Sequence, residues 1–409
     1  MDFLTATLDE ASTALLRAKL DDFAQKNREE VALQQIEWEA YWRELVNVSV
    51  HQRGADVAEI GSTWVEPLVA MNVLAPFSGS EINSIGGKGS FFPAFWQSVR
   101  YESDPNACWG IPARMDIRMI FYWHDMFDAA KIEPHQAFSS PEAMKDAFSR
   151  LQHSVPHPWG EITSKASAGL VYNVASWVWA AGGDFISPDG RKLLINTQEA
   201  RQGIRNHYEL IEFMPPECRN SSHDVVADLF ATRKIAAMIG GPWLFAYLRN
   251  VGLTPTMIDL VNVISPPGPP FIGGSVFIRW KHSRKADLAW KLIKVLSEKD
   301  FNLAFSNATN WLPSHQDAWS DEILHQNKCN PEYLKGLQNG RCLPSVRLWG
   351  MIEDRLTQMF GNMWDDLYAL HEQARSESVD QIMAKHLEPL TIRFETILNE
   401  YHQPPTWED

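Results

Sequence analysis

Cysteine is scarce in this chain of 409 residues, which contains four. Cys108, Cys218, Cys329 and Cys342 are too few to frame a small disulfide-rich scaffold. Their spacing also differs from the CxxC and Cys/His patterns of a structural zinc site, so we predict no metal site and no disulfide framework. Cys329 and Cys342 are near enough in sequence to pair across a short loop, and the sequence leaves that pairing open.

Positive charge is also scarce, since 37 Lys and Arg stand against 51 Asp and Glu for a net charge of −14. Proteins bind nucleic acids and anionic membranes largely through Lys and Arg, which neutralise the phosphates. The balance of charge therefore argues against a nucleic-acid partner and against a protein of the membrane surface.

Long apolar runs are missing as well. The longest stretch without charge spans 166–183, and its Ser, Asn and paired Gly residues make it a poor membrane span. Asp9, Glu10 and Arg17 interrupt the N-terminal segment, which also lacks a basic start, so no secretory signal is predicted. We expect a wholly soluble chain, periplasmic or extracellular if a leader has been removed, with a cytoplasmic location left open.

No constellation of catalytic residues stands out. The Gly87-Lys88 pair has no Gly five positions earlier, as a phosphate-binding loop requires. The stretch 273–277 lacks the final Gly of a nucleophile elbow, because Phe277 stands there. Two distant carboxylates could still meet in the fold as a glycosidase pair, an alternative that the sequence leaves open. We predict that the protein is not an enzyme and uses no cofactor.

Aromatic residues, by contrast, are abundant: the chain has 17 Trp, 20 Phe and 9 Tyr. Core packing accounts for most of them, since large aromatic side chains bury much apolar area. The remaining aromatic side chains would bind a ligand that has a flat face.

Segments with helical spacing alternate with short apolar runs in the first part of the chain. Strands that alternate with helices in this way predict parallel sheets with helices on their faces, and hence an α/β fold. The sequence predicts helices over 15–25, 41–50 and 65–71, and strands over 31–33 and 56–60.

Three clusters of turn-forming residues interrupt this pattern, near 109, 268 and 310. The Pro-rich segment 265–270, for example, cannot lie inside a helix or a central strand. Because an α/β segment lies between successive breaks, the sequence suggests two lobes that the chain visits alternately. The expected segments are 1–109 plus 268–309 for the N-terminal lobe and 110–267 plus 310–409 for the C-terminal lobe, with hinge crossings near 109–112, 263–271 and 306–313.

Several phrases of the sequence occur together, and in the same order, in a known family. They are Ala55-Asp56-Val57 leading to Gly61-Ser62-Thr63-Trp64, Gly110-Ile111-Pro112 with 121–127, 179–183 leading to 196–200, 230–238 followed by Gly240-Gly241-Pro242-Trp243, and Leu312-Pro313-Ser314. From residue 55 to about residue 315 the chain resembles the extracellular solute-binding protein family 1, in its maltose- and trehalose-binding branch.

The resemblance implies a two-lobed periplasmic-binding-protein-like fold, in which each lobe is a mostly parallel sheet flanked by helices and a multi-strand hinge joins the two. It also implies a monomer that closes around a carbohydrate in the cleft between the lobes and delivers it to the permease subunits of an ABC transporter. A sugar sensor or regulator of the same fold is the alternative, and an enzyme acting on glycosides in the cleft is a third.

A sugar ring has an apolar C–H face and a rim of hydroxyls, so its site needs an aromatic platform and fixed polar groups. By resemblance, Trp243 is the expected platform, with core packing as the alternative. Arg114 and Asp116 follow the first crossing. There each would form two hydrogen bonds with neighbouring sugar hydroxyls, or the two side chains would form an ion pair with each other. Gly274 would let backbone N–H groups approach the ligand. The other ligand contacts that the resemblance implies are Trp64, Tyr172, Trp311, Arg347 and Trp349.

Overall fold

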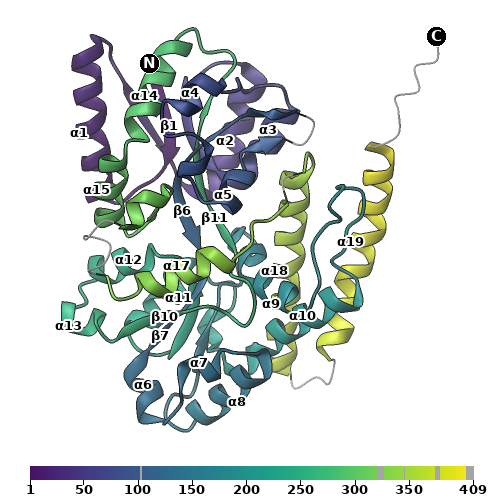
Figure 1. Ribbon diagram of the computed structural model, residues 1–409. Helices are drawn as coiled ribbons and strands as arrows, with labels where there is room; N and C mark the ends of the chain where they lie inside the picture. The colour runs from purple at the N-terminus through teal and green to yellow at the C-terminus, as the bar shows by residue number, and fades with distance from the viewer. Residues whose placement is uncertain (102–103, 321–326, 345, 374–377, 402–409) are drawn as a thin grey trace. The chain divides into compact units, whose positions relative to one another are not determined.

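The chain folds into two units, each assembled from three segments (Figure 1). The structure, a computed structural model, describes residues 1–101, 104–320, 327–344, 346–373 and 378–401. Unit 1 comprises Met1–Ile117, Gly241–Asn250 and Ile272–Gly350, and unit 2 comprises Arg118–Gly240, Val251–Phe271 and Met351–Asp409.

Unit 1 is built on a six-stranded sheet with the strand order β12-β6-β11-β3-β1-β2. The strand β1 runs parallel to β2 and β3, whereas β11 runs antiparallel to β3 and β6, and β12 antiparallel to β6. Every residue of β3 is buried, as expected of an interior strand in a sheet covered on both faces. The strands are β1 (Asp2–Ala6), β2 (Ala32–Ile36), β3 (Val57–Gly61), β6 (Ile111–Ile117), β11 (Ile272–Arg279) and β12 (Leu312–Pro313).

Two helices of unit 1, α1 and α4, begin at a side chain that caps them. Asp9, for example, accepts a hydrogen bond from the backbone N–H of Ser12 at 3.0 Å and so begins α1. The helices are α1 (Glu10–Asn27), α2 (Trp38–His51), α3 (Val65–Ala70), α4 (Gly79–Asn83), α5 (Pro93–Gln97), α12 (Leu244–Asn250), α14 (Ala286–Leu296), α15 (Lys299–Thr309) and α17 (Asn330–Asn339), and a hairpin is formed by β4 (Arg100–Tyr101) and β5 (Asp104–Cys108).

Unit 2 has a four-stranded sheet with the order β10-β7-β9-β8, in which β8 and β9 are parallel and the other pairs antiparallel. Its strands are β7 (Met119–Trp123), β8 (Trp159–Gly160), β9 (Ala237–Gly240) and β10 (Val261–Ile264). Its helices are α6 (His124–Ala129), α7 (Pro134–Ala137), α8 (Pro141–Leu151), α9 (Gly169–Ala180), α10 (Gln198–Tyr208), α11 (His223–Ala231), α13 (Pro255–Ile258), α18 (Trp349–Gln373, which starts with the last two residues of unit 1) and α19 (Val379–Tyr401).

The uncharged stretch 166–183 contains α9, and the side chains from Leu170 to Trp179 are buried on every side of this helix. Its close partner is α10, because a Cβ built on Gly203 would overlap the carbonyl oxygen of Trp177. A twelve-residue helix buried in a core accounts for the missing charge. Within the described ranges, no helix combines the length and the apolar character that crossing a bilayer requires.

Both sheets are mixed, and this corrects the expectation of mostly parallel sheets. The alternating pattern on which that expectation was based covers β1, β2 and β3, which are indeed parallel. The chain, however, leaves unit 1 at the end of β6 and re-enters it at the start of β11. These two neighbouring strands therefore run in opposite directions. Parallel pairing needs a crossover connection within one unit, and these strands do not have one.

The units also differ from the expected lobe segments. The largest difference concerns 310–350, which lies in the expected C-terminal lobe but belongs to unit 1, because β12 pairs with β6 through Leu312 and Pro313. The segment Gly241–Asn250 belongs to unit 1 as well, although it lies within the expected C-terminal lobe. The first exchange between units follows Ile117, several residues beyond the expected crossing at 109–112.

The cysteines are all free thiols, so Cys329 and Cys342 do not pair in this structure. The Cys342 thiol instead donates to the carbonyl oxygen of Ala94 at 3.2 Å. Much of the tryptophan content serves the cores, where the largest fully buried side chains include Trp123, Trp159, Trp177, Trp280, Trp349 and Trp364.

Candidate functional site

The strand β6 gathers most of the expected ligand contacts of unit 1. In the sheet register, Gly274 on β11 lies opposite Met115, and Ser275 lies opposite Arg114. On the other side of β6, Leu312 and Pro313 of β12 pair with the same two residues. The register therefore brings the expected contacts Arg114, Asp116 and Gly274 together, and Trp311 directly precedes β12. Trp243 approaches Asp116 beside Gly241, and we call these five residues the β6 cluster.

Asp116 and Trp243 meet beside a glycine. A Cβ built on Gly241 would overlap both the Oδ1 of Asp116 and the Nε1 of Trp243, so these atoms approach the same point. Asp116 is buried and Trp243 is half-buried. A carboxylate oxygen accepts hydrogen bonds and an indole N–H donates one. The pair therefore presents an acceptor and a donor together, which is what a sugar hydroxyl requires.

Gly274 has a conformation that suits glycine, with φ +133°. A Cβ at this position would overlap the carbonyl oxygen of Arg114, so the absence of a side chain lets β11 approach β6. The register between the two strands shifts just beyond this point, between Ser275 and Val276. Gly274 thus permits the close approach of β11 to the backbone of β6 at Arg114 and Asp116.

Arg114 forms an ion pair with the buried Glu59, which lies on β3. One oxygen of Glu59 accepts from Nη2 of Arg114, and the other accepts from the hydroxyl of Ser275. The Arg114 guanidinium also lies 3.9 Å from the centre of the Phe305 ring. Burial lowers the pKa of Arg114, while the neighbouring Glu59 carboxylate raises it and so favours the charged form. Glu59 is a residue that the sequence reasoning missed.

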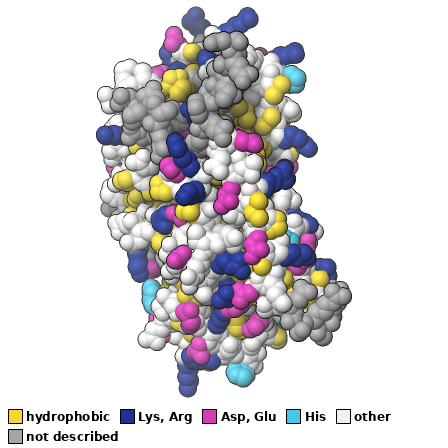
Figure 2. All heavy atoms as spheres, turned by 90° about the vertical axis from the view of Figure 1, so that its right-hand side faces the viewer, with side chains coloured by type: hydrophobic (Ala, Val, Ile, Leu, Met, Phe, Trp, Pro, Cys, Tyr) yellow, Lys and Arg dark blue, Asp and Glu magenta, His cyan; other side chains and the backbone are white. Residues whose placement is uncertain are grey.

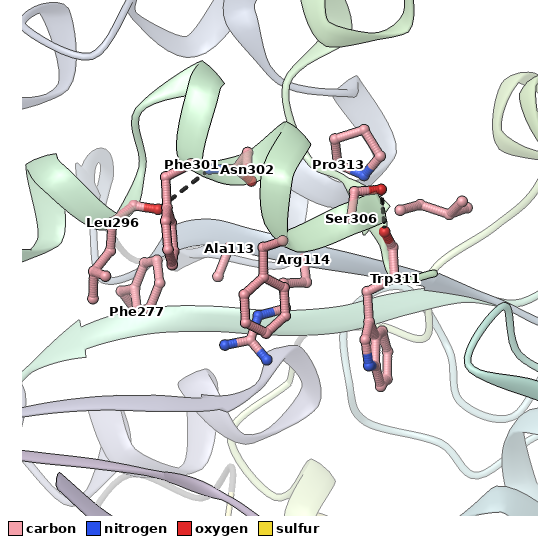
Figure 3. A pocket seen from close by; sticks show the side chains of 11 residues that line it. Ala113, Arg114, Phe277, Leu296, Phe301, Asn302, Ser306, Trp311 and Pro313 are labelled. Atoms are coloured by element: carbon pink, nitrogen blue, oxygen red, sulfur yellow. Dashed lines mark hydrogen bonds between the residues drawn. The ribbon is translucent and has the colours of Figure 1, made fainter. Parts of the chain in front are cut away.

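A pocket lies beside Arg114, between β6, β11 and α15 (Figure 3). The space between its lining atoms, part of which is open to solvent, amounts to about 270 Å³. Two of its polar side chains already bind the backbone, since Ser306 donates to the carbonyl oxygen of Trp311 at 2.5 Å and Asn302 to that of Leu296 at 3.3 Å. Its lining is mostly apolar: Ala113, Arg114, Phe277, Leu296, Phe301, Asn302, Phe305, Ser306, Trp311, Leu312 and Pro313. The residues of this pocket therefore pack against Trp311 and Arg114 and support them. A mostly apolar lining does not suit a ligand with many hydroxyl groups.

Trp64, another expected ligand contact, is covered by other aromatic rings. Its centroid lies 4.6 Å from that of Trp38 in a stacked pair, 5.8 Å from that of Trp42 and 5.9 Å from that of Tyr41. Trp64 is consequently only 5% exposed, whereas Trp38 is 37% exposed. We call these four residues the aromatic cluster. The spacing of Trp38, Tyr41 and Trp42 on α2 is the signal that would have revealed it.

Tyr172 lies on α9 of unit 2, where its ring stacks on that of Phe271 with a centroid distance of 4.4 Å and an interplanar angle of 2°. The guanidinium of Arg118 lies 5.7 Å from the same ring. Tyr172 is buried. Its expected role as a ligand contact is not tested by this arrangement, which positions the ring firmly.

The two C-terminal candidates differ from each other. Arg347 is exposed, in the turn that precedes α18. Trp349, the first residue of α18, is fully buried, so in this structure its indole contributes to packing. Arg347 and Trp349 are only two positions apart in the chain. The sequence pattern alone could not show that the tryptophan is buried while the arginine is exposed.

A cation site is not evident: the described part of the chain has no group of three or more His, Cys, Asp and Glu side chains placed to hold a metal ion. A Ser–His contact does occur in unit 2, where Ser167 Oγ lies 3.2 Å from His223 Nε2. Burial, together with the positive charge of Arg118, lowers the pKa of His223 to about 3. His223 is therefore neutral at ordinary pH.

Solved structures of other proteins share this fold. The GacH receptor of Streptomyces glaucescens, studied without ligand and in complex with acarbose, has a TM-score of 0.80 at 16% identity, covering 97% of this chain and 98% of that one. The sugar-binding protein MalE of Xanthomonas citri has a TM-score of 0.79 at 17% identity, covering 99% and 100%. The fold is thus the two-lobed fold of periplasmic binding proteins.

Sequence comparison assigns the family. The family model described as bacterial extracellular solute-binding protein matches residues 18–331, which is more than half of the chain. A binding protein of Brucella abortus is 21% identical over 326 residues, covering 78% of this chain and 77% of that protein. The chain belongs to the bacterial extracellular solute-binding protein family.

Proposed function

We propose that this protein captures a carbohydrate and delivers it to the permease of an ABC transporter. The observation that supports this most directly is the meeting of Asp116 and Trp243 beside Gly241. A sugar hydroxyl that loses water must regain both a donor and an acceptor, since an unpaired buried polar group costs about 1–3 kcal/mol. Asp116 supplies the acceptor, and the indole of Trp243 supplies a donor and an apolar surface for the C–H face of the ring.

Related structures support the same ligand class. GacH binds acarbose and MalE of Xanthomonas citri is described as sugar-binding, and both share the fold of this chain. Within the β6 cluster, the Arg114 guanidinium has more N–H donors than its bond to Glu59 uses, and Trp311 lies next to it in the pocket lining. We propose these two as further ligand contacts, with Tyr172, Trp64 and Arg347 as subordinate candidates; Trp349, which is fully buried, is no longer among them.

Calorimetry against mono-, di- and oligosaccharides tests the proposal. Binding of at least one sugar is expected, and Trp243→Ala and Asp116→Asn should each weaken it at least tenfold, which corresponds to about 1.4 kcal/mol. Trp290→Ala is a matched control, because Trp290 is also a half-buried tryptophan of unit 1 but packs on Phe77 at 5.6 Å. Equal affinity of Trp243→Ala and the wild type would show that the site has been assigned to the wrong residues.

The proposal includes four finer statements about the protein in the cell. It acts outside the cytoplasmic membrane, as the family description supports; it is a monomer; it binds permease subunits; and it leaves its ligand chemically unchanged. Figure 2 shows basic and acidic side chains interspersed on one face, which does not suit a polyanionic partner. Fractionation, sedimentation, co-purification with a permease and product analysis after incubation with glycosides test these statements in turn.

A non-transport sugar sensor is the second candidate, and the same site would serve it. The two differ in their partner, so permease and ATPase genes beside the gene for this chain favour delivery. A signalling protein as the sole co-purifying partner would instead favour the sensor.

A further inference from the structure

One hydrogen bond connects the two chain segments that carry the tryptophans of the β6 cluster. Arg249 lies near the end of α12, the helix that directly follows Trp243. Its Nη2 donates to the Oδ1 of Asn310, the residue before Trp311. Arg249 therefore joins the segments of two proposed ligand contacts without being one of them.

The segment that carries Trp243 and α12 depends on such contacts for its position. Gly241–Asn250 is the shortest of the three segments of unit 1, and α12 has 7 residues, too few for a helix that is stable alone. The buried side chains of Leu244 and Leu248 anchor one side of α12. The N–H of Tyr247 donates to the carbonyl oxygen of Trp243 at 3.1 Å. Since this bond fixes Trp243 to the first turn of the helix, a shift of α12 also moves the indole.

Asn310, by contrast, has a fixed backbone. It ends α15 in the left-handed conformation, with φ +61°, which Asn adopts more readily than most residues. Its N–H donates to the carbonyl oxygen of Ser306 at 2.7 Å, and the Ser306 hydroxyl donates to the carbonyl oxygen of Trp311 at 2.5 Å (Figure 3). The N–H of Trp311 donates to the Thr309 hydroxyl at 3.1 Å. The Asn310 side chain is therefore a firm point of attachment for Arg249.

The charge of Arg249 strengthens this attachment. Burial lowers the pKa of the Arg249 guanidinium, while the negative charge of Asp9 raises it and so favours the charged form. A hydrogen bond from a charged donor is stronger than one between neutral groups. Asp9 also begins α1, since its carboxylate accepts from the N–H of Ser12 at 3.0 Å. Three separate segments of unit 1, namely the start of α1, α12 and the end of α15, thus meet near one guanidinium.

We infer that Arg249 is a positioning residue, which fixes α12 against the loop at Asn310 so that Trp243 and Trp311 keep one arrangement in the absence of ligand. A preorganised site loses less entropy when it binds. The effect on affinity rests on the proposed function, whereas the effect on the two indoles does not require a ligand. The two effects can therefore be measured separately.

Fluorine NMR of the full chain labelled with fluorotryptophan tests the arrangement without ligand, and the two resonances are assigned with Trp243→Phe and Trp311→Phe. Arg249→Ala should shift both resonances. Arg249→Lys, which keeps the charge and a donor, should restore most of both shifts. Arg17→Ala is the matched control, because Arg17 is also an exposed arginine on a helix of unit 1, and it should leave both resonances unchanged.

Calorimetry with the sugar that the wild type binds most tightly tests the consequence for binding. Arg249→Ala should weaken binding about fivefold, which is the usual contribution of one hydrogen bond, and Arg249→Lys should recover most of the loss. Asn310→Gly removes the acceptor, keeps the left-handed backbone and should weaken binding by a similar factor. The variant with Arg249→Ala and Asn310→Gly should bind no more weakly than either alone, since both remove the same contact.

The possible failures are distinct. If the wild type binds no sugar, the proposed function fails, and the fluorine spectra still decide the positioning role. If Arg249→Ala leaves both indole resonances in place, or shifts them without a loss of affinity in a protein that binds sugar, Arg249 does not position the site. Losses that add up in the double variant, or that Arg249→Lys does not recover, would likewise overturn the inference. Equal thermal unfolding midpoints of Arg249→Ala and the wild type are expected, and a lower midpoint would indicate a folding role instead.

Discussion

Arg114 and Glu59, which lie on strands separated by β11, form an ion pair within the sheet of unit 1. Neither group could stay charged there alone, because an isolated buried charge is strongly unfavourable. Tyr41 adds to this network with its hydroxyl 2.8 Å from the carbonyl oxygen of Glu59, and burial raises the pKa of that hydroxyl well above its ordinary value. Removing one partner therefore affects both the stability of unit 1 and the position of Arg114.

Glu59→Gln should destabilise the protein by about 3 kcal/mol, because it leaves the Arg114 charge buried without a carboxylate. Chemical denaturation measures this effect as a shift of the unfolding midpoint. Ser275→Ala removes one hydrogen bond to the same carboxylate and should cost about 1 kcal/mol. Similar midpoints for Glu59→Gln and Ser275→Ala would contradict the importance given to the buried charge.

Gly274→Ala should destabilise unit 1 by about 2 kcal/mol or more, since an added Cβ meets the carbonyl oxygen of Arg114 at φ +133°. Gly79→Ala is the matched control, because nothing lies within 4 Å of a Cβ built there and Ala favours the helix α4. Thermal unfolding of the two variants should give a lower midpoint for the first and an unchanged or higher one for the second. The reverse order would mean that β11 does not need this glycine.

Gly241→Ala should abolish ligand binding while costing less stability than Gly274→Ala. The new methyl group would push apart the Asp116 carboxylate and the Trp243 indole, which both approach that position. Gly240→Ala is the neighbouring control, because its nearest contact would be an ordinary 3.6 Å to Met238. Calorimetry with the sugar that the wild type binds most tightly should show no binding by Gly241→Ala and near-wild-type affinity for Gly240→Ala. If Gly241→Ala binds with wild-type affinity, the Asp116–Trp243 pair is not part of the binding site.

Acid should destabilise the protein partly through His223, whose pKa is lowered to about 3 by burial and by Arg118. In the unfolded chain a histidine takes up a proton near pH 6.5, whereas the folded form of His223 stays neutral to about pH 3. The unfolded state therefore binds more protons over this interval, and stability falls as pH drops from about 6.5 towards 3. His223→Gln should show a shallower fall in stability than the wild type, and His51→Gln, at an exposed position, should not.

The cysteines should be unreactive in the folded protein and all available after unfolding. Burial raises the pKa of Cys218 and of Cys342 to about 12, so little thiolate forms at neutral pH. Alkylation without reductant, followed by mass spectrometry, should add four labels in denaturant and almost none in buffer. A mass two units lower, with two labels missing, would indicate that Cys329 and Cys342 are joined after all.

The α/β class, the two-part organisation and several residues of the site were predictable because they depend on local sequence. The fold and the family confirm the resemblance. Arg114 and Asp116 share a strand, and Trp243 follows a Gly-Gly-Pro turn, so local phrases could identify them. Their roles as ligand contacts stay predictions.

What could not be predicted depends on pairing between distant segments. Nothing near Arg114 in sequence points to Glu59, since the two meet only through the register of β3, β11 and β6. The same holds for Trp64, whose exposure is decided by Trp38 and Trp42 on another element. Burial of Trp349 likewise reflects tertiary packing and not its neighbours in the chain.

The division of each unit into three separated segments has a consequence for biosynthesis. While the ribosome has made only the first 271 residues, the sheet of unit 1 still lacks β11, the strand that lies between β3 and β6. The nascent chain therefore exposes two strand edges that invite wrong pairing until late in translation. Delayed, post-translational folding is the expected behaviour, and neither half of the gene should yield a stable fragment when expressed by itself.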